Sequence, residues 1–160
     1  MLFKEEQTFS KWKVGLILLI AVSGIIIALL TQEETTKTTY YTLVGIFILM
    51  SVMSVLIFKS KLETSIDRFA IKYRFFPFIS SWKRIEREQI KTVEVIKYSP
   101  IGDYGGYGYR LSFRNGRALN VGGNMGLKII DHQDKKLLIG TQKPVELEQA
   151  LTKFLAEKPE

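Results

Sequence analysis

The chain has 160 residues, and its 23 Lys and Arg residues outnumber its 16 Asp and Glu residues, for a formal net charge of +7. This length accommodates one ordinary domain with accessory segments and excludes a large multidomain enzyme. Cysteine is absent, which excludes disulfides, thiolate nucleophiles and cysteine-based metal clusters.

Two uncharged apolar segments dominate the first third of the chain. Residues 14–32 and 38–58 contain no charged residue, and each approaches the roughly 20 residues that a helix needs to cross a bilayer core. Only the polar segment TQEETTK separates them, so we expect a tight antiparallel hairpin of transmembrane helices at about 14–31 and 41–58. A cleaved signal peptide is the alternative for the first segment. Its apolar run is too long, however, and ALLTQEE offers no small-residue cleavage site.

Basic residues are concentrated before the first predicted span and after the second: Lys4, Lys11, Lys13, Lys59, Lys61, Arg68, Lys72 and Arg74. Only Lys37 lies in the connection, where two glutamates accompany it. The positive-inside rule therefore predicts an integral membrane protein with both termini in the cytoplasm. Gly24 and Ala28 form a small-xxx-small pair in the first span, a spacing that would allow helices to approach closely and the chain to form a homo-oligomer.

Residues 59–160 carry the whole excess of positive charge and predict one small cytoplasmic domain, after an N-terminal segment and hairpin over residues 1–58. In AIKYRFF, Ile71, Tyr73 and Phe75 alternate with the residues between them, which is the period of a half-buried strand. LETSID, SWKRI and IKTVEVIKY predict further strands, and the polar EREQ separates the last two.

Glycine-rich segments divide the second half of this domain. SPIGDYGGYG predicts a loop, and YRLSF and ALNV predict strands on either side of RNGR. Asn115-Gly116 is a strong signal for a type I′ hairpin turn, in which both central residues need a positive φ. After VGGNMG, the strands GLKIID and KKLLIG are joined by HQD, so the pattern predicts an antiparallel meander of about seven or eight short strands.

The last segment of the chain changes to a helical period. In PVELEQALTKFLAEK, apolar residues recur on one helical face, namely Leu147, Ala150, Leu151, Phe154 and Leu155. Pro144 suits the first position of a helix, so we expect an amphipathic helix at about 144–157. Its apolar face is expected to pack over the sheet, with partner binding as the alternative.

Four segments carry a resemblance to a known family: IDRFAIKYRFFPF, EREQIKTVEVIKYSPIGDYGGYGYR, ALNVGGNMGLKI and KKLLIGTQKPVELEQAL. With a two-span anchor ahead of them, they resemble the bacterial pleckstrin-homology-like (PH-like) membrane proteins over about two thirds of the chain. The resemblance implies a membrane-anchored α+β protein with an antiparallel barrel or sandwich of about seven strands and a C-terminal amphipathic helix. It implies no particular activity, because a fold does not determine a function.

The motifs predict no catalytic, cofactor or metal site. GDYGGYG and GGNMG match neither dinucleotide-binding nor P-loop patterns and are interpreted as turns. His132 in DHQD lacks converging metal ligands and an oriented nucleophile, so it is expected in a solvated turn. Tyr104, Tyr107 and Tyr109 lie among the glycines and are candidates either for contact with a protein partner or for core packing.

Seven basic residues are the candidate lipid-binding residues: Lys59, Lys61, Arg68, Lys72, Arg74, Lys83 and Arg84. Only Glu63 and Asp67 accompany them, which leaves this stretch with a net charge of +5 beside the predicted membrane. In one interpretation, each of these residues contributes about 1 kcal/mol of attraction to anionic lipid head groups near the membrane surface. In the other, they only determine the orientation of the predicted spans through the positive-inside rule. The resemblance adds a match of Lys61 and Lys72-x-Arg74 to the basic pattern of lipid-binding PH domains.

The sequence thus predicts a noncatalytic, membrane-anchored interaction module that presents a cytoplasmic surface to a protein partner or to anionic lipid. One alternative is a small-ligand sensor or enzyme that uses the glycine- and tyrosine-rich loops. The other is a structural subunit of a larger membrane complex. No recognisable motif favours a nucleic acid as partner.

Overall fold

The computed structural model describes residues 1–31 and 37–156, without the side chains of residues 11–14, 17 and 29–31. The chain forms two compact units: a helical unit over residues 9–60, and a β unit that joins residues 1–8 to the chain from Lys61 onward. The first eight residues therefore belong with the β-rich part of the chain and not with the helices, unlike the division expected from sequence.

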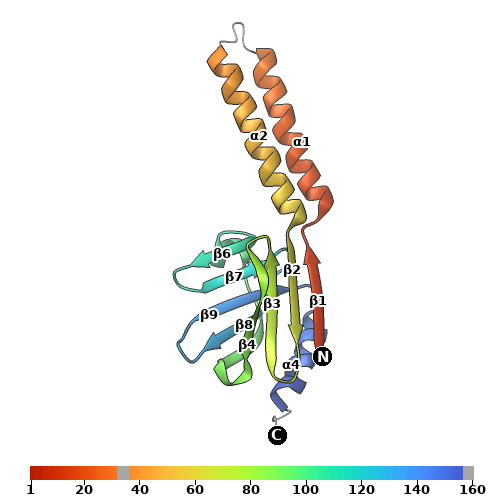
Figure 1. Cartoon of the computed structure of the whole chain (residues 1–160), viewed down its shortest axis with the longest axis vertical. Coiled ribbons are helices and arrows are strands. Elements are labelled where there is room, and N and C mark those ends of the chain that lie inside the picture. The colour runs from red at the N-terminus through yellow and green to blue at the C-terminus, as the bar shows by residue number, and fades with distance from the viewer. Residues whose placement is uncertain (32–36, 157–160) are drawn as a thin grey trace. The chain divides into compact units, whose positions relative to one another are not determined.

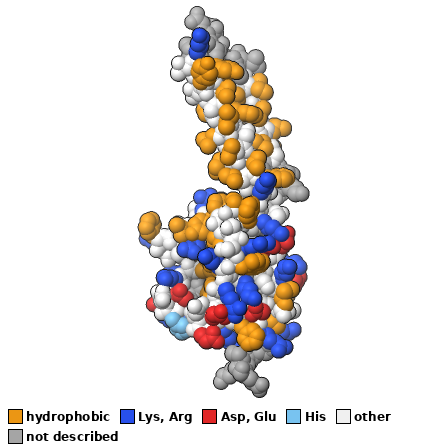
Figure 2. Space-filling model, viewed as in Figure 1, with side chains coloured by type: hydrophobic (Ala, Val, Ile, Leu, Met, Phe, Trp, Pro, Cys, Tyr) orange, Lys and Arg blue, Asp and Glu red, His pale blue; other side chains and the backbone are white. Residues whose placement is uncertain are grey.

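The helical unit contains α1 (Lys11–Thr31) and α2 (Lys37–Lys59), which pack against one another (Figure 1). α2 is long and apolar enough to cross a membrane, whereas the apolar stretch found among the described residues of α1 is the shorter Leu18–Ala28. Large apolar side chains are exposed on both helices, and they dominate the visible surface of this unit (Figure 2). The second predicted span thus coincides with α2, while most of TQEETTK lies outside the described residues.

Sheet A of the β unit is antiparallel throughout and has the order β1-β2-β3-β4. Its strands are β1 (Phe3–Thr8), β2 (Lys61–Ile66), β3 (Ala70–Phe76) and β4 (Ile79–Glu86). The alternation expected for β3 is confirmed, because Ile71, Tyr73 and Phe75 are buried. β1 was not expected. It buries Phe3, Glu5 and Gln7, and two of these three side chains are polar.

Sheet B has the order β5-β8-β9-β7-β6. Its strands are β5 (Ile90–Lys97), β6 (Gly108–Ser112), β7 (Gly116–Asn120), β8 (Met125–Asp131) and β9 (Lys136–Thr141). After β7 the chain crosses to pair β8 with β5, and β9 then fills the gap between β8 and β7, parallel to β7. The domain is therefore not a simple meander. Its strands form two sheets of four and five strands without closing into a barrel.

The hairpin predicted at Asn115-Gly116 is confirmed, but its turn is not of type I′. Ser112 pairs with Gly116, so three residues form the loop between β6 and β7. Gly116 has a φ of 76°, whereas Asn115 does not adopt a positive φ. A Cβ atom at Gly116 would overlap the backbone carbonyl oxygen of Lys136. The close approach of this backbone is therefore a second reason, besides the positive φ, why glycine is required at position 116.

Two short helices occupy segments that were expected to be irregular. η1 (Arg87–Gln89) replaces the polar EREQ connection, and α3 (Pro100–Tyr104) lies within the predicted SPIGDYGGYG loop. Ser99 begins α3, because its Oγ accepts a 3.1 Å hydrogen bond from the Gly102 amide, and Gly105 ends it with a φ of 71°.

The expected C-terminal helix is α4 (Pro144–Ala156), which contacts β1 and β2 of sheet A and β5 of sheet B. Four of the five predicted stripe residues are buried, namely Leu147, Ala150, Leu151 and Phe154. Leu155 is 52% exposed and does not belong to the packed face. α4 therefore covers strands from both sheets of the β unit.

Buried polar contacts join β1 to the end of β9. The Glu5 carboxylate accepts hydrogen bonds from Thr141 Oγ1 at 2.7 Å and from the Gln142 amide at 2.8 Å. Gln7 Nε2 donates to the Gly140 carbonyl at 2.7 Å. These contacts tie the first residues of the chain to sheet B across more than 130 positions of sequence.

Candidate functional site

The candidate lipid-binding residues are distributed over several elements. Lys61, Lys72 and Arg74 alternate with buried residues of β2 and β3, and Arg84 of β4 pairs directly with Lys72, so all four lie on the outer face of sheet A. Lys59 ends α2, Arg68 lies between β2 and β3, and Lys83 is exposed on β4. The structure therefore brings four of the seven together on one sheet face.

Carboxylates from neighbouring strands neutralise much of this face. Lys61 Nζ lies 2.7 Å from Glu6 Oε1 and 3.4 Å from Glu63 Oε1. Arg74 also pairs with Glu63, and its guanidinium lies over the Trp82 ring at 5.0 Å from the ring centroid. Glu6 comes from β1 and was absent from the local charge count that suggested a strongly basic stretch.

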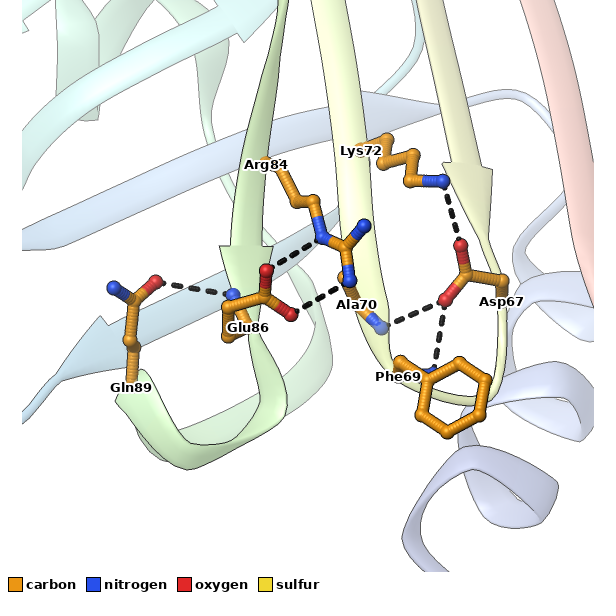
Figure 3. Close-up of polar contacts among 7 residues, drawn as sticks. All are labelled: Asp67, Phe69, Ala70, Lys72, Arg84, Glu86 and Gln89. Carbon is orange, nitrogen blue, oxygen red and sulfur yellow. Dashed lines mark hydrogen bonds and ion pairs between the residues drawn. The ribbon is translucent and has the colours of Figure 1, made fainter. Parts of the chain in front are cut away.

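The other two basic residues of this face also pair with carboxylates, one at the β2–β3 turn and one on β4 (Figure 3). Lys72 Nζ lies 2.8 Å from Asp67 Oδ2, while Asp67 Oδ1 accepts from the amides of Phe69 and Ala70. Arg84 pairs with Glu86 through two contacts of 2.6 and 2.9 Å. All four basic residues on the outer face thus have an acidic partner, which reduces the charge left to attract an anionic surface.

Two of these carboxylates have lowered pKa values. The hydrogen bond from Arg74 lowers the pKa of Glu63, although burial of Glu63 acts in the opposite direction. Burial would raise the pKa of Asp67, but the Lys72 ammonium and two backbone amides together outweigh it and lower that pKa. Both carboxylates therefore remain ionised at neutral pH and keep the ion pairs of the face intact.

The three candidate tyrosines do not form one surface. Tyr104 is buried, lies edge-on to Tyr98 with ring centroids 5.9 Å apart, and donates a long 3.4 Å hydrogen bond to the Asn115 carbonyl. Tyr107 is partly exposed and donates to the Gly123 carbonyl at 3.3 Å. Tyr109 stacks on Phe78 at 6.0 Å between centroids. For Tyr104, core packing is therefore the role that the structure shows.

A groove of about 920 Å³ opens in the β unit, away from the glycine-rich loops. η1, the β6–β7 hairpin and the β8–β9 turn surround it, and Tyr73 and Ile129 supply buried side chains to its lining. Its β6 side carries the 70% exposed Leu111 and the fully exposed Phe113. β6 is the last strand of sheet B, so one of its hydrogen-bonding edges has no partner strand among the described residues, although α3 contacts β6.

The charges around this groove differ in how far they are already paired. Asp134 pairs with Lys91 at 2.6 Å, and Asp131 accepts hydrogen bonds from the amides of its own turn. Arg114 and Arg117 have no acidic partner among the described residues. The groove thus combines exposed apolar side chains with two guanidinium groups that have no acidic partner among the described residues, although that of Arg117 lies over the Tyr109 ring at 5.8 Å from the ring centroid.

Apart from His132, which the sequence places in a solvated turn, the groove residues were not considered as candidate site residues from the sequence. The only local signal is SFRNGR, in which an apolar Phe113 and two arginines occupy a turn that would ordinarily be polar. The groove itself depends on η1 and the β8–β9 turn, which come from distant parts of the sequence.

His132 is exposed in the β8–β9 turn, at the rim of the groove, as its sequence context predicts. Within residues 1–31 and 37–156, no three His, Asp or Glu side chains gather in a way that could hold a metal ion. Comparison of the chain with protein-family models, curated proteins and solved structures finds no match.

Proposed function

We propose that the chain is a noncatalytic, membrane-anchored interaction module. In this proposal α1 and α2 cross the membrane as a hairpin and hold a PH-like β unit at the cytoplasmic surface. The C-terminal helix and the two sheets support the PH-like relationship, since α4 packs on strands of both. The uneven distribution of basic residues supports the cytoplasmic orientation.

The register of β1 with β2 carries the proposal of a hairpin. Thr8, the last residue before the helical unit, pairs directly with Lys61, the first residue after it. Because both belong to one sheet, the two ends of the helical unit must lie on the same side of any membrane. The chain can then cross only an even number of times, so a crossing by α2 requires a return crossing by α1.

The groove supports a protein partner over the other partners considered. An unpaired strand edge beside exposed apolar side chains can accept an extended peptide segment by strand addition. Arg114 and Arg117 favour an acidic residue in that segment. The outer face of sheet A offers less to anionic lipid, because its basic residues are paired with carboxylates.

Cysteine labelling tests the topology of the proposed anchor, because the chain has no cysteine of its own and only the introduced thiol can react. Glu34→Cys introduces a thiol between the two helices, and Gln133→Cys introduces one in the exposed β8–β9 turn. A membrane-impermeant maleimide should label position 34 in intact cells and position 133 only after lysis. Labelling of both positions from one side would contradict the hairpin, and the reverse pattern would contradict the cytoplasmic orientation alone.

Photocrosslinking tests the interaction surface. A photoreactive residue at Phe113 should form a discrete crosslinked product in cells, whereas one at the similarly exposed Phe69, outside the groove, should not. The product should disappear when Arg114 and Arg117 are changed to Glu. Equal crosslinking from both positions would contradict a partner in the groove.

A further inference from the structure

The turn between β3 and β4 presents aromatic side chains to solvent. Phe76 is 45% exposed and Phe78 is 58% exposed. Phe78 is nevertheless held in place, since its ring lies against buried Phe75 with centroids 5.4 Å apart and stacks on Tyr109. Neighbouring exposed aromatic rings are unfavourable in water and are typical of a surface that contacts an apolar or interfacial environment.

The strand register places this turn at the end of sheet A where the chain enters and leaves the helical unit. Phe76 pairs with Lys61, which itself pairs with Thr8, so the three residues form one row across β3, β2 and β1. Only Ser60 separates Lys61 from the last residue of α2. Ser60 is hydrogen-bonded to the last turn of α2. Its Oγ donates to the Leu56 carbonyl at 2.8 Å, and its amide donates to the Ile57 carbonyl at 3.1 Å.

This short connection limits the distance between the turn and the end of α2. Two peptide units span at most about 8 Å, and paired Cα atoms in a sheet lie about 5 Å apart. The Cα of Phe76 therefore lies within roughly 13 Å of the Cα of Lys59, whatever the angle between the two units. The polar layer of a bilayer is about 5–7 Å thick on each side, so a Phe ring can reach it from there.

From these observations we propose that Phe76 and Phe78 insert into the interfacial layer of the lipid bilayer, as a second contact of the β unit with the membrane. The inference rests on the proposed membrane anchor. The interface is where aromatic side chains of membrane proteins concentrate, because it accommodates a ring beside polar head groups. The turn would thereby limit the motion of the β unit on its short tether.

The same sheet provides a matched control. Phe69 is 55% exposed, which is close to the value for Phe78, but it lies in the β2–β3 turn at the opposite end of β3. Six or more residues of strand separate it from the aromatic turn, a distance of about 20 Å. The proposal thus predicts that two phenylalanines with equal exposure differ in their contact with lipid.

Depth-dependent quenching in the full chain tests this prediction. Phe78→Cys and Phe69→Cys are each labelled with an environment-sensitive fluorophore after reconstitution into phosphatidylcholine vesicles that contain or lack a head-group nitroxide lipid. The label at position 78 should be quenched several-fold more strongly by the nitroxide lipid than the label at position 69. Aqueous iodide should quench in the opposite order. Equal quenching at the two positions would overturn the proposal.

A second labelling site keeps both phenylalanines in place. On a Ser80→Cys background, nitroxide quenching should fall several-fold when Phe76 and Phe78 are changed to Ser, and should not change with Phe69→Ser. An unchanged signal in the double variant would show that the rings do not hold the turn at the membrane.

Met53→Cys in α2 separates failure of this inference from failure of the anchor. Nitroxides deep in the acyl chains should quench a label at that position. If they do, and the labels at positions 78 and 69 are still quenched equally by the head-group nitroxide lipid, only the insertion of the aromatic turn is wrong. If they do not, the anchor is wrong and the inference falls with it.

Discussion

Glu63 is the residue on which the charge arrangement of sheet A depends. Its side chain is almost fully buried, yet it contacts two basic side chains, Lys61 and Arg74, that are each about one third exposed. A carboxylate in this position stabilises the fold only while it is ionised. Its lowered pKa shows that the folded state favours the charged form.

Replacing this carboxylate should lower stability in a pH-dependent way. We expect Glu63→Gln to lower the free energy of unfolding by about 1–2 kcal/mol at neutral pH, less than for a fully buried pair because solvent reaches the cations. Because the folded pKa is lowered, the advantage of the wild type is present above the ordinary pKa of Glu63 and is lost as pH falls through the lowered value.

Urea unfolding of the detergent-solubilised protein, followed by tryptophan fluorescence at several pH values, measures this difference. Glu88→Gln is the control, since Glu88 is exposed and its replacement should change stability by less than about 0.5 kcal/mol. A difference between wild type and Glu63→Gln that persists unchanged in acid would contradict an electrostatic origin.

Among the elements, α4 and β1 contribute to the β unit by different means. α4 carries a continuous apolar face, so its helical period is visible in the sequence and it packs on both sheets. β1 instead buries Glu5 and Gln7, whose polar atoms bond to Thr141, Gln142 and Gly140. Such a strand has no apolar alternation, which is why sequence patterns did not predict it.

The packing of α4 predicts a sharp contrast between neighbouring residues. Phe154 is 1% exposed, and removing its ring should cost about 3 kcal/mol or more, because a cavity remains in the core. Leu155→Ala should cost less than about 0.5 kcal/mol, since Leu155 is largely exposed. Thermal unfolding monitored by circular dichroism distinguishes the two variants. Equal losses of stability would mean that α4 is rotated about its axis and buries a different face.

At the scale of the whole molecule, the helical unit is an insertion between two paired strands. Residues 9–60 leave the β unit after Thr8 and return at its direct partner Lys61. A two-residue Asn-Gly turn is suited to joining paired antiparallel strands. The register therefore predicts that the helical unit can be removed without disrupting sheet A.

A chain in which Asn-Gly replaces residues 9–60 should be soluble and should unfold cooperatively. A chain that begins at Lys61 lacks β1 and leaves an edge of β2 unpaired, so it should melt at a lower temperature or aggregate. Size-exclusion chromatography and thermal unfolding compare the two. If they behaved alike, β1 would not be an integral strand of the β unit.

Local patterns in the sequence determined where most strands begin and end, the apolar character of both helices and the position of α4. These features arise from side-chain periodicity within one segment, which is complete in the sequence itself. The tertiary structure alone decided that β7 and β9 run parallel, that β1 joins sheet A, and that Glu6 and Glu63 pair with Lys61 and Arg74. It also formed the groove. Each of these depends on contacts between residues brought together by strand pairing, and strand pairing is not encoded in the period of any single segment.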